Sequence, residues 1–253
     1  MSLFAYTLFS SSSGNSSLFG DGNNMFLIDA GVSAKRLTCA INGIGADASR
    51  VDGIFITHDH TDHISGVEVF CRKTGICVHA PGAVADKIKA AGLVAHDRIY
   101  TVTLGDFTVS SFPTSHDTRT SVGYTVVHKS GLKLGYATDT GVVTDGMYEA
   151  LRGCYGVILE SNYDERMLSD GAYPPDVKER IASDAGHLSN RQCAEFLPYL
   201  YGSGVRRVLL AHISPENNTP ELALSSALAA KEKYGLDELY IECAKSAGYT
   251  KLI

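Results

Sequence analysis

Thr57-His58-Asp59-His60-Thr61-Asp62-His63 is the stretch of this 253-residue chain that says most about its fold. It has the pattern H-x-H-x-D-H and ends an apolar run, residues 51–57, that we expect to form a strand. Imidazole nitrogens and carboxylate oxygens on a loop at a strand end can turn inward together as ligands for divalent metals. A polar surface turn is the alternative, but so many ligand side chains in one short loop favour a metal site.

This stretch resembles the signature motif of the metallo-β-lactamase superfamily, and the resemblance implies three further ligands, each of which follows a predicted strand. They are His116, Asp139 and His212. A single histidine or aspartate after a strand is more often structural, so each of the three is weak evidence alone. Their order along the chain, after the histidine-rich stretch, makes the set strong.

The ordered set resembles the metallo-β-lactamase superfamily. That resemblance implies one fold class, α/β (α+β), arranged as a four-layer αββα sandwich that carries two divalent metal ions. By the same resemblance the first metal is bound by His58, His60 and His116. The second metal is bound by Asp62, His63 and His212, and Asp139 bridges the two.

Two cations about 3.5–4 Å apart share and acidify a water, and they stabilise the charge that develops on a phosphoryl group. The expected nucleophile is a hydroxide between the two metals, with Asp62 counted among the catalytic residues. Mixed nitrogen and oxygen ligands accept zinc, manganese or iron, so the native metal stays open. Asp29 matches an aspartate that supports the histidine loop from outside the metal shell, although a role at a helix start is an alternative.

A bridging aspartate at position 139 points away from β-lactam hydrolysis, but glyoxalase II-type thioesterases share it with phosphodiesterases. The segment Gly186-His187-Leu188-Ser189-Asn190 discriminates better, because phosphodiesterase branches place a histidine loop in this interval. There His187 would act as a general acid or a phosphate ligand. The alternative for His187 is a solvent-facing loop histidine before a helix that Ser189 or Asn190 caps.

Motifs along nearly the whole chain narrow the resemblance to the bacterial YycJ/WalJ exonuclease group. They are residues 9–17, 137–141, 159–164, 186–190 and 211–218. This resemblance implies a 5′ to 3′ exonuclease acting on DNA, with manganese as an activating ion. In that context we expect substrate contacts from Ser13, Asn15, Asn162 and Ser189, with Asp164 as a further candidate. We expect Glu160 to be a buried supporting carboxylate, and His79, His96 and His128 to be structural or surface residues.

Composition is that of an ordinary globular protein, with 44% hydrophobic and 20% charged residues. We expect one domain, residues 1–253, without a membrane span. The six cysteines form no C-x-x-C pair and no targeting segment is evident, which indicates the cytoplasm. The net charge of −6 counts mildly against nucleic acid as a partner, and a homodimer stays open.

Several functions compete with the nuclease. The nearest is a small-molecule cyclic phosphodiesterase acting on phosphoribosyl cyclic phosphate, followed by a glyoxalase II-like thioesterase. A non-catalytic partner protein is the alternative from another class, although a complete ligand set argues against it. Fewer than 50 residues separate Asp139 from His187, which leaves no room there for a β-CASP insertion or a ribonuclease Z arm.

The remaining pattern predicts strands alternating with helices. We expect strands at residues 4–9, 25–28, 51–57, 76–79, 99–103, 107–112, 123–128, 132–138, 156–160, 205–211 and 238–242. We expect helices at residues 32–42, 64–73, 176–183, 189–199 and 220–234. Residues 10–17 are expected to form a serine-rich loop, and residues 129–131 a hairpin turn.

Overall fold

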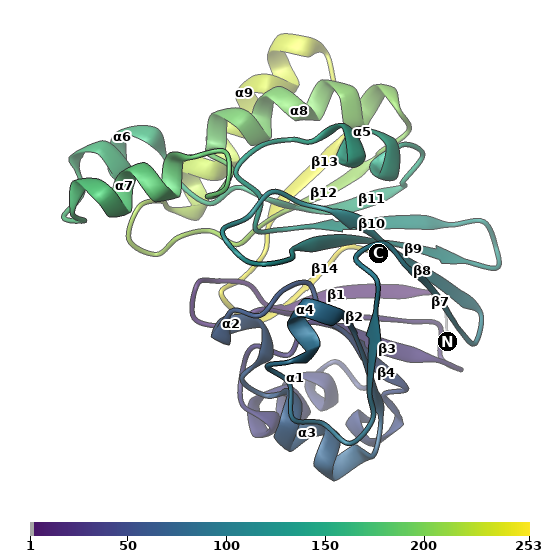
Figure 1. Cartoon of the computed structure of the whole chain (residues 1–253). Helices are drawn as coiled ribbons and strands as arrows, with labels where there is room; N and C mark the ends of the chain where they lie inside the picture. Colours follow the sequence, from purple (N-terminus) through teal and green to yellow (C-terminus); the bar gives the residue numbers. More distant parts are fainter. Residues whose placement is uncertain (1–2) are drawn as a thin grey trace.

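Two mixed β-sheets face each other at the centre of the molecule, in a computed structural model that describes residues 3–253 (Figure 1). Each sheet has seven strands. The first sheet has the order β14-β1-β2-β3-β4-β5-β6. Its strands are β1 (Phe4–Phe9), β2 (Ser16–Gly20), β3 (Met25–Ile28), β4 (Gly53–Phe55), β5 (Cys77–Pro81), β6 (Leu93–His96) and β14 (Ala247–Lys251).

The second sheet has the order β13-β12-β11-β10-β9-β8-β7. Its strands are β7 (Thr101–Leu104), β8 (Phe107–Pro113), β9 (Val122–His128), β10 (Lys133–Ala137), β11 (Gly156–Glu160), β12 (Arg207–Ala211) and β13 (Tyr240–Cys243). Within each sheet one half is parallel: β3 to β6 in the first and β10 to β13 in the second. Parallel strands end at one edge of a sheet, and ligand sites form beyond that edge.

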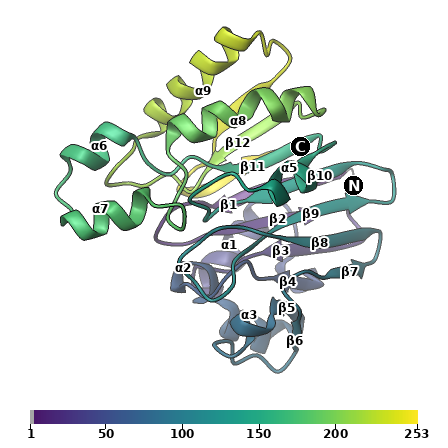
Figure 2. The ribbon, with the colours of Figure 1, turned by 45° about the horizontal axis from the view of Figure 1, so that its top comes forward.

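Helices cover the outer face of each sheet, which gives four layers (Figures 1 and 2). The first sheet is covered by α1 (Ala34–Gly43), the short η1 (Ala48–Arg50), α2 (Thr61–Ile64), α3 (Val67–Thr74) and α4 (Gly82–Ala85). The second is covered by α5 (Asp145–Leu151), α8 (Asn190–Gly202) and α9 (Pro220–Tyr234). A pair of short helices, α6 (Glu165–Asp170) and α7 (Pro175–Ala182), projects to one side in both views.

Separate apolar clusters fill the three interfaces between these layers. Between the sheets, aromatic side chains dominate: the rings of Phe26 and Phe55 meet edge to face at 5.3 Å, and Phe55 meets Tyr124 at 5.8 Å. Each sheet therefore buries both faces, and the four-layer αββα sandwich predicted for the chain is confirmed. The single domain expected for residues 1–253 stays a prediction.

Most expected elements form within a few residues of their predicted bounds, and the hairpin turn at residues 129–131 joins β9 to β10. Three expectations need correction. Ser16 and Ser17 belong to the buried strand β2 and not to the serine loop. The helix predicted at residues 64–73 corresponds to α3, which begins only at Val67 after the separate short helix α2, and β6, β14 and helices α4 to α6 were not predicted.

The division between α2 and α3 follows from close packing at Gly66. Its backbone N–H donates to the carbonyl of Ala30 at 2.8 Å, and a Cβ on Gly66 would lie 2.0 Å from the carbonyl oxygen of Val32. The segment after β3 thus presses against the chain just after the histidine loop. Among residues 3–253, no helix is long and apolar enough to cross a membrane.

Candidate metal centre

Among residues 3–253, three non-glycine residues adopt left-handed backbone angles, and each lies within two positions of the end of a strand. They are Asp29 after β3, Asp139 after β10 and His212 after β12, with φ of 60°, 57° and 55°. This conformation costs roughly 1–2 kcal/mol for an L-residue and concentrates at functional sites. The strand ends of both sheets are therefore bent to aim these side chains into one place.

All seven predicted ligands converge there in overlapping groups, whose donor atoms lie within 4.8 Å of one another. One group is His58, His60 and His116, and another is Asp62, His63 and His212. Asp139 joins His58 and His63 in a third group, and His212 in a fourth. The structure thus brings together side chains that are up to 154 positions apart, from His58 to His212.

Buried atoms without partners test whether this set fits a metal. His58 Nε2, Asp139 Oδ2 and His212 Nε2 are buried and make no hydrogen bond within the described chain. A buried polar atom without a partner costs about 1–3 kcal/mol, and all three belong to the converging set. Nitrogen and carboxylate donors in one pocket suit borderline divalent cations, so the residues fit the metals that the fold implies.

Outer hydrogen bonds orient the imidazoles of the histidine loop. His63 Nδ1 lies 2.7 Å from Asp29 Oδ2, and His58 Nδ1 lies 3.0 Å from the hydroxyl of Thr57. The Thr57 hydroxyl donates to Asp29, whose carboxylate is fully buried. Asp29 therefore supports the ligands from behind, the position expected for it, because a partner at Nδ1 leaves Nε2 for a metal.

Glu160 performs the same task on the other sheet. Its Oε1 lies 2.8 Å from His187 Nδ1 and 2.9 Å from His212 Nδ1. Its Oε2 accepts backbone N–H bonds from Thr140 and Leu188. Burial alone would raise the pKa of Glu160, but the charges and hydrogen bonds of His187 and His212 lower it to about 2. The sequence predicted a buried supporting carboxylate here but not that it holds two histidines.

Charges in the cluster compensate one another. Burial would lower the pKa of His212, but Asp139, Asp62 and Glu160 raise it to about 10. Burial would likewise raise the pKa of Asp139, yet the surrounding imidazoles hold it well below its ordinary value. Once a metal cation displaces the protons of these histidines, the pocket therefore presents a strong negative charge to that cation.

Of the four residues expected to contact substrate, Asn15 and Asn162 bond to ligand residues, and the four differ in exposure. Asn15 is buried, and its amide donates to Asp62 Oδ2 at 3.1 Å. Asn162 is buried and donates to the carbonyl of His212 at 2.8 Å, and the fully buried Ser189 caps α8. Ser13 alone is exposed. Substrate contact stays a prediction for all four, and their exposure favours Ser13.

The backbone of the serine loop also reaches the site. Asn15 N–H donates to the carbonyl of Asp62 at 2.8 Å, and Gly31 N–H donates to that of Asn15. A Cβ on Gly31 would lie 1.5 Å from the Asp62 oxygen, so only glycine permits this approach. Of the other candidates, Asp164 caps α6 with its side chain.

Sequence reasoning missed Asp117 and Arg180. Asp117 Oδ1 lies 3.4 Å from His116 Nε2 and 3.7 Å from His60 Nε2, and its Oδ2 accepts from Arg180 Nη1 at 2.7 Å. The only signal for Asp117 was its place directly after His116. Nothing in the sequence pairs it with a cation 63 positions away.

The remaining histidines lie outside the cluster. His79 Nδ1 lies 2.9 Å from His96 Nε2 at one edge of the first sheet. His128 Nε2 lies 3.3 Å from Asp21 Oδ2 near the β9–β10 hairpin. Both contacts fit the structural roles expected for them.

Family comparison agrees with this site. Residues 24–213 match the beta-lactamase superfamily domain. The chain belongs to the metallo-β-lactamase superfamily and is a hydrolase of that fold, whose members hold divalent metal ions. A crystal structure of the metallo-beta-lactamase fold protein YhfI from Bacillus subtilis superposes with a TM-score of 0.75 at 17% identity, covering 98% of this chain and 99% of that one.

Curated relatives lie nearer in sequence. Exodeoxyribonuclease YycJ of Bacillus anthracis is 35% identical over 242 residues, which cover 93% of this chain and 91% of that protein. Exodeoxyribonuclease WalJ of Streptococcus pneumoniae is 36% identical over 230 residues, covering 87% of this chain and 85% of that protein. The resemblance to the YycJ/WalJ group is thereby confirmed.

Proposed function

We propose that this chain is a two-metal phosphodiesterase that degrades DNA from the 5′ end. One observation carries the proposal: the ring of His187 lies against the ligand cluster, 4.9 Å from the ring of His116 and 5.3 Å from that of His212. Its Nδ1 is bound to Glu160, and 18% of its side chain is exposed. A histidine held this way has a free ring nitrogen at the place where a phosphodiester would lie.

We propose the ligand roles that the resemblance implies. The first metal would be held by His58, His60 and His116 and the second by Asp62, His63 and His212, with Asp139 serving both. When bound, two divalent cations supply an acidified water and polarise the phosphoryl oxygen. The names of the curated relatives support DNA as the substrate, and zinc or manganese as the metal suits the donor set.

His187 assists the departure of the leaving group, which the metals do not protonate. Departure of an alkoxide is difficult, and a positioned imidazolium can protonate the leaving oxygen or bind a phosphate oxygen. Glu160 Oε1 lies 2.8 Å from Nδ1 of His187, so Nε2 is the ring nitrogen left to face the leaving oxygen. Around it, Ser13 and the amides of the serine loop are proposed to meet phosphate oxygens.

The test uses protein loaded with manganese and, separately, with zinc. Cleavage of 5′-phosphorylated duplex DNA is followed on a sizing gel, for the unmodified chain and for Asp139→Ala and His187→Ala. We expect stepwise shortening from the 5′ end that is abolished in Asp139→Ala and reduced about 10²–10⁴-fold in His187→Ala. His128→Ala, which changes a histidine outside the cluster, serves as the matched control and should cleave normally.

The same preparations separate the leading function from its rival. A small phosphodiester, bis-p-nitrophenyl phosphate, is offered in place of DNA. Metal-dependent turnover of this compound without any shortening of DNA would reject the nuclease and favour a cyclic phosphodiesterase. Shortening from the 3′ end, or internal cuts, would reject the proposed direction.

A further inference from the structure

Two basic side chains are tied to aspartates that adjoin the metal-ligating histidines. Arg180 Nη1 lies 2.7 Å from Oδ2 of Asp117, which follows His116. Lys87 Nζ lies 2.6 Å from Oδ2 of Asp59, which lies between His58 and His60. The same arrangement thus occurs twice, once beside each histidine motif of the first metal.

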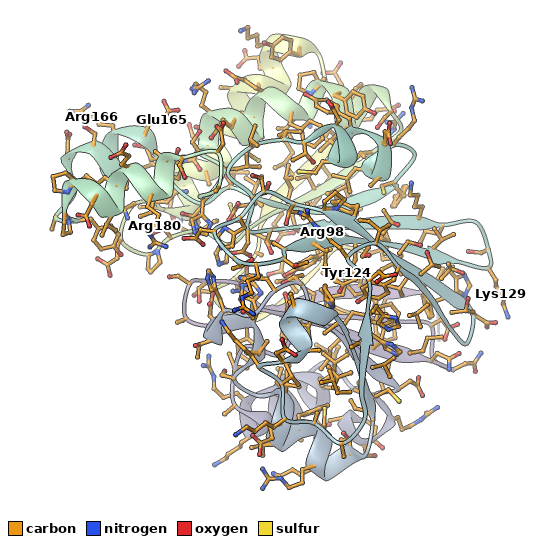
Figure 3. All side chains as sticks on the ribbon, viewed as in Figure 1. Arg98, Tyr124, Lys129, Glu165, Arg166 and Arg180 are labelled. Atoms are coloured by element: carbon orange, nitrogen blue, oxygen red, sulfur yellow. The ribbon has the colours of Figure 1, made fainter. Side chains whose placement is uncertain are left out.

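The two cations come from different elements of the fold. Arg180 belongs to α7 in the pair of projecting helices, and Figure 3 shows it below that helix. Lys87 follows α4, in the layer that covers the first sheet. The first-metal histidines therefore have a guanidinium group beside one motif and an ammonium group beside the other.

Both cations remain accessible although they are paired. The side chains of Arg180 and Lys87 are 58% and 59% exposed, whereas those of Asp117 and Asp59 are 26% and 5% exposed. Arginine has five N–H donors and lysine three, so one carboxylate contact leaves donors for a phosphate. The aspartates hold the long side chains in place, which reduces the ordering cost when a ligand binds.

The two cations supply local positive charge for a polyanion in a chain whose net charge is negative. A net charge of −6 repels a polyanion at long range, and a small substrate would need no further cations beside the metals. A polynucleotide presents phosphates on either side of the one that is cleaved. Guanidinium and ammonium groups are the usual protein partners of such phosphates.

We propose that Arg180 and Lys87 bind the phosphates that flank the scissile one, and so make the site select a polynucleotide over a small phosphodiester. The inference rests on the proposed nuclease function and assigns the residues that set its substrate class. Asp117 and Asp59 are positioning residues in this scheme, because each holds its cation beside the histidines. The four residues together form a phosphate clamp around the metal centre.

The experiment compares Arg180→Ala, Lys87→Ala and the double variant with the unmodified chain, all in the manganese-loaded form. For each, kcat/KM is measured on 5′-phosphorylated DNA over a salt series and on bis-p-nitrophenyl phosphate. We expect the DNA to small-substrate ratio to fall about tenfold per cation removed. The slope of log(kcat/KM) for DNA against log salt should become shallower by about 0.7–0.9 per cation.

Two controls isolate the clamp from general charge effects. Arg166→Ala removes a cation whose side chain is 91% exposed at the outer end of α6, on the same helical pair (Figure 3). It should leave both the ratio and the salt slope unchanged. Arg180→Lys keeps the charge and should retain the salt slope of the unmodified chain while losing part of the ratio.

Three outcomes would overturn the inference. An unchanged salt slope in the double variant would show that neither cation meets DNA. An equal loss on DNA and on the small substrate, accompanied by loss of bound manganese in elemental analysis, would make both pairs mere supports of the metal ligands. Failure of the unmodified chain to cleave DNA would reject the proposed function as well. This outcome is distinguishable because it is seen in the unmodified chain, before any substitution is made.

Discussion

Glu160 shows how one buried carboxylate can link metal binding to proton transfer. A single oxygen of Glu160 faces Nδ1 of both His187 and His212. His212 is a proposed metal ligand and His187 the proposed acid, so one carboxylate oxygen orients the rings of both. Because both backbone N–H bonds go to the second oxygen, the side chain has no freedom to serve the histidines separately.

Glu160→Gln is therefore expected to damage both functions at once. The backbone donors keep the amide oxygen on their side, so the NH₂ group faces two nitrogens that need an acceptor. We expect metal affinity and phosphodiester turnover each to fall about 10–100-fold. Isothermal titration with manganese and steady-state kinetics measure the two separately. His187→Ala should lower turnover alone, and a Glu160→Gln variant that keeps full metal affinity would contradict the shared role.

Tyr124 anchors the histidine loop to the core between the sheets. Its hydroxyl donates to the carbonyl of Ile56 at 2.6 Å, just before the loop, and lies 2.7 Å from the hydroxyl of Tyr100. Burial raises the pKa of Tyr124 well above its ordinary value, so the group stays neutral.

Tyr124→Phe should destabilise the fold, because it leaves the Ile56 carbonyl and the Tyr100 hydroxyl buried without this partner. We expect the free energy of unfolding to fall by about 1–3 kcal/mol in urea denaturation. Tyr249→Phe, at a ring that is 48% exposed, is the control and should change it by less than about 0.5 kcal/mol. Equal free energies of unfolding for the two variants would show that the Tyr124 hydroxyl does not stabilise the fold.

The start of α8 fixes where His187 lies. Ser189 accepts from Gln192 N–H, and the Gln192 side chain accepts from Ser189 N–H in a complete capping box. The loop that carries His187 therefore ends at a helix whose first turn is fully determined. Thr219 caps α9 in a similar way, through a bond from Leu222 N–H.

These two caps allow a matched comparison. Ser189→Ala and Thr219→Ala should each lower the free energy of unfolding by about 0.5–2 kcal/mol, because each removes one N-cap bond. Only Ser189→Ala should also lower kcat on DNA, since only that cap lies close to the proposed acid, two positions after His187. Thermal melts and single-turnover cleavage test this, and equal kinetics in both variants would count against a link between the cap and His187.

Elements were predictable where periodicity and composition agreed. Strand β11 and helix α9 form at their predicted bounds because one is a continuous apolar run and the other begins at Pro220 and ends before Gly235. Strand β2 was not predicted because its first residues are serines, which are typical of loops, although every residue in the strand is buried. Strand β14 was not predicted either, because only one of its five residues is buried.

The residues of the site likewise divide into those that were predictable from the sequence and those that were not. The seven ligands were predictable because each follows a strand and fits a known order of motifs. The pairs Asp117–Arg180 and Asp59–Lys87 were not, because each joins residues from elements that only the folded sheets bring together. Charge pairing at long range has no periodicity, so the chain contains no local signal for it.

The two sheets are also joined by a stack of rings. His79 of β5 lies over Phe55 at 4.9 Å, His96 of β6 meets His79 at 5.2 Å, and Tyr100 meets His96 at 4.2 Å. Tyr100 then contacts Tyr124 of the second sheet through its hydroxyl. The stack thus connects an edge of the first sheet to the centre of the second.

Titration of this stack should make the stability of the whole fold depend on pH. Burial lowers the pKa of both His79 and His96 below the ordinary 6.5. The neighbouring His96 lowers the pKa of His79 further, and Asp97 offsets part of the lowering at His96. The unfolded chain therefore binds protons first as pH falls. The stability is fully present above pH 6.5, begins to be lost below it, and is lost completely once the folded pair is protonated.

His96→Phe keeps the stacked ring and removes one titrating group, so its melting temperature should fall less than that of the unmodified chain between pH 7.5 and pH 5.5. Thermal melts of both proteins across this range measure the difference, in which the contribution of the metal-ligand histidines cancels. His128→Gln changes a histidine outside the stack and should keep the full pH dependence. If His96→Phe and the unmodified chain lose the same number of degrees on acidification, the histidine stack is not what couples the sheets to pH.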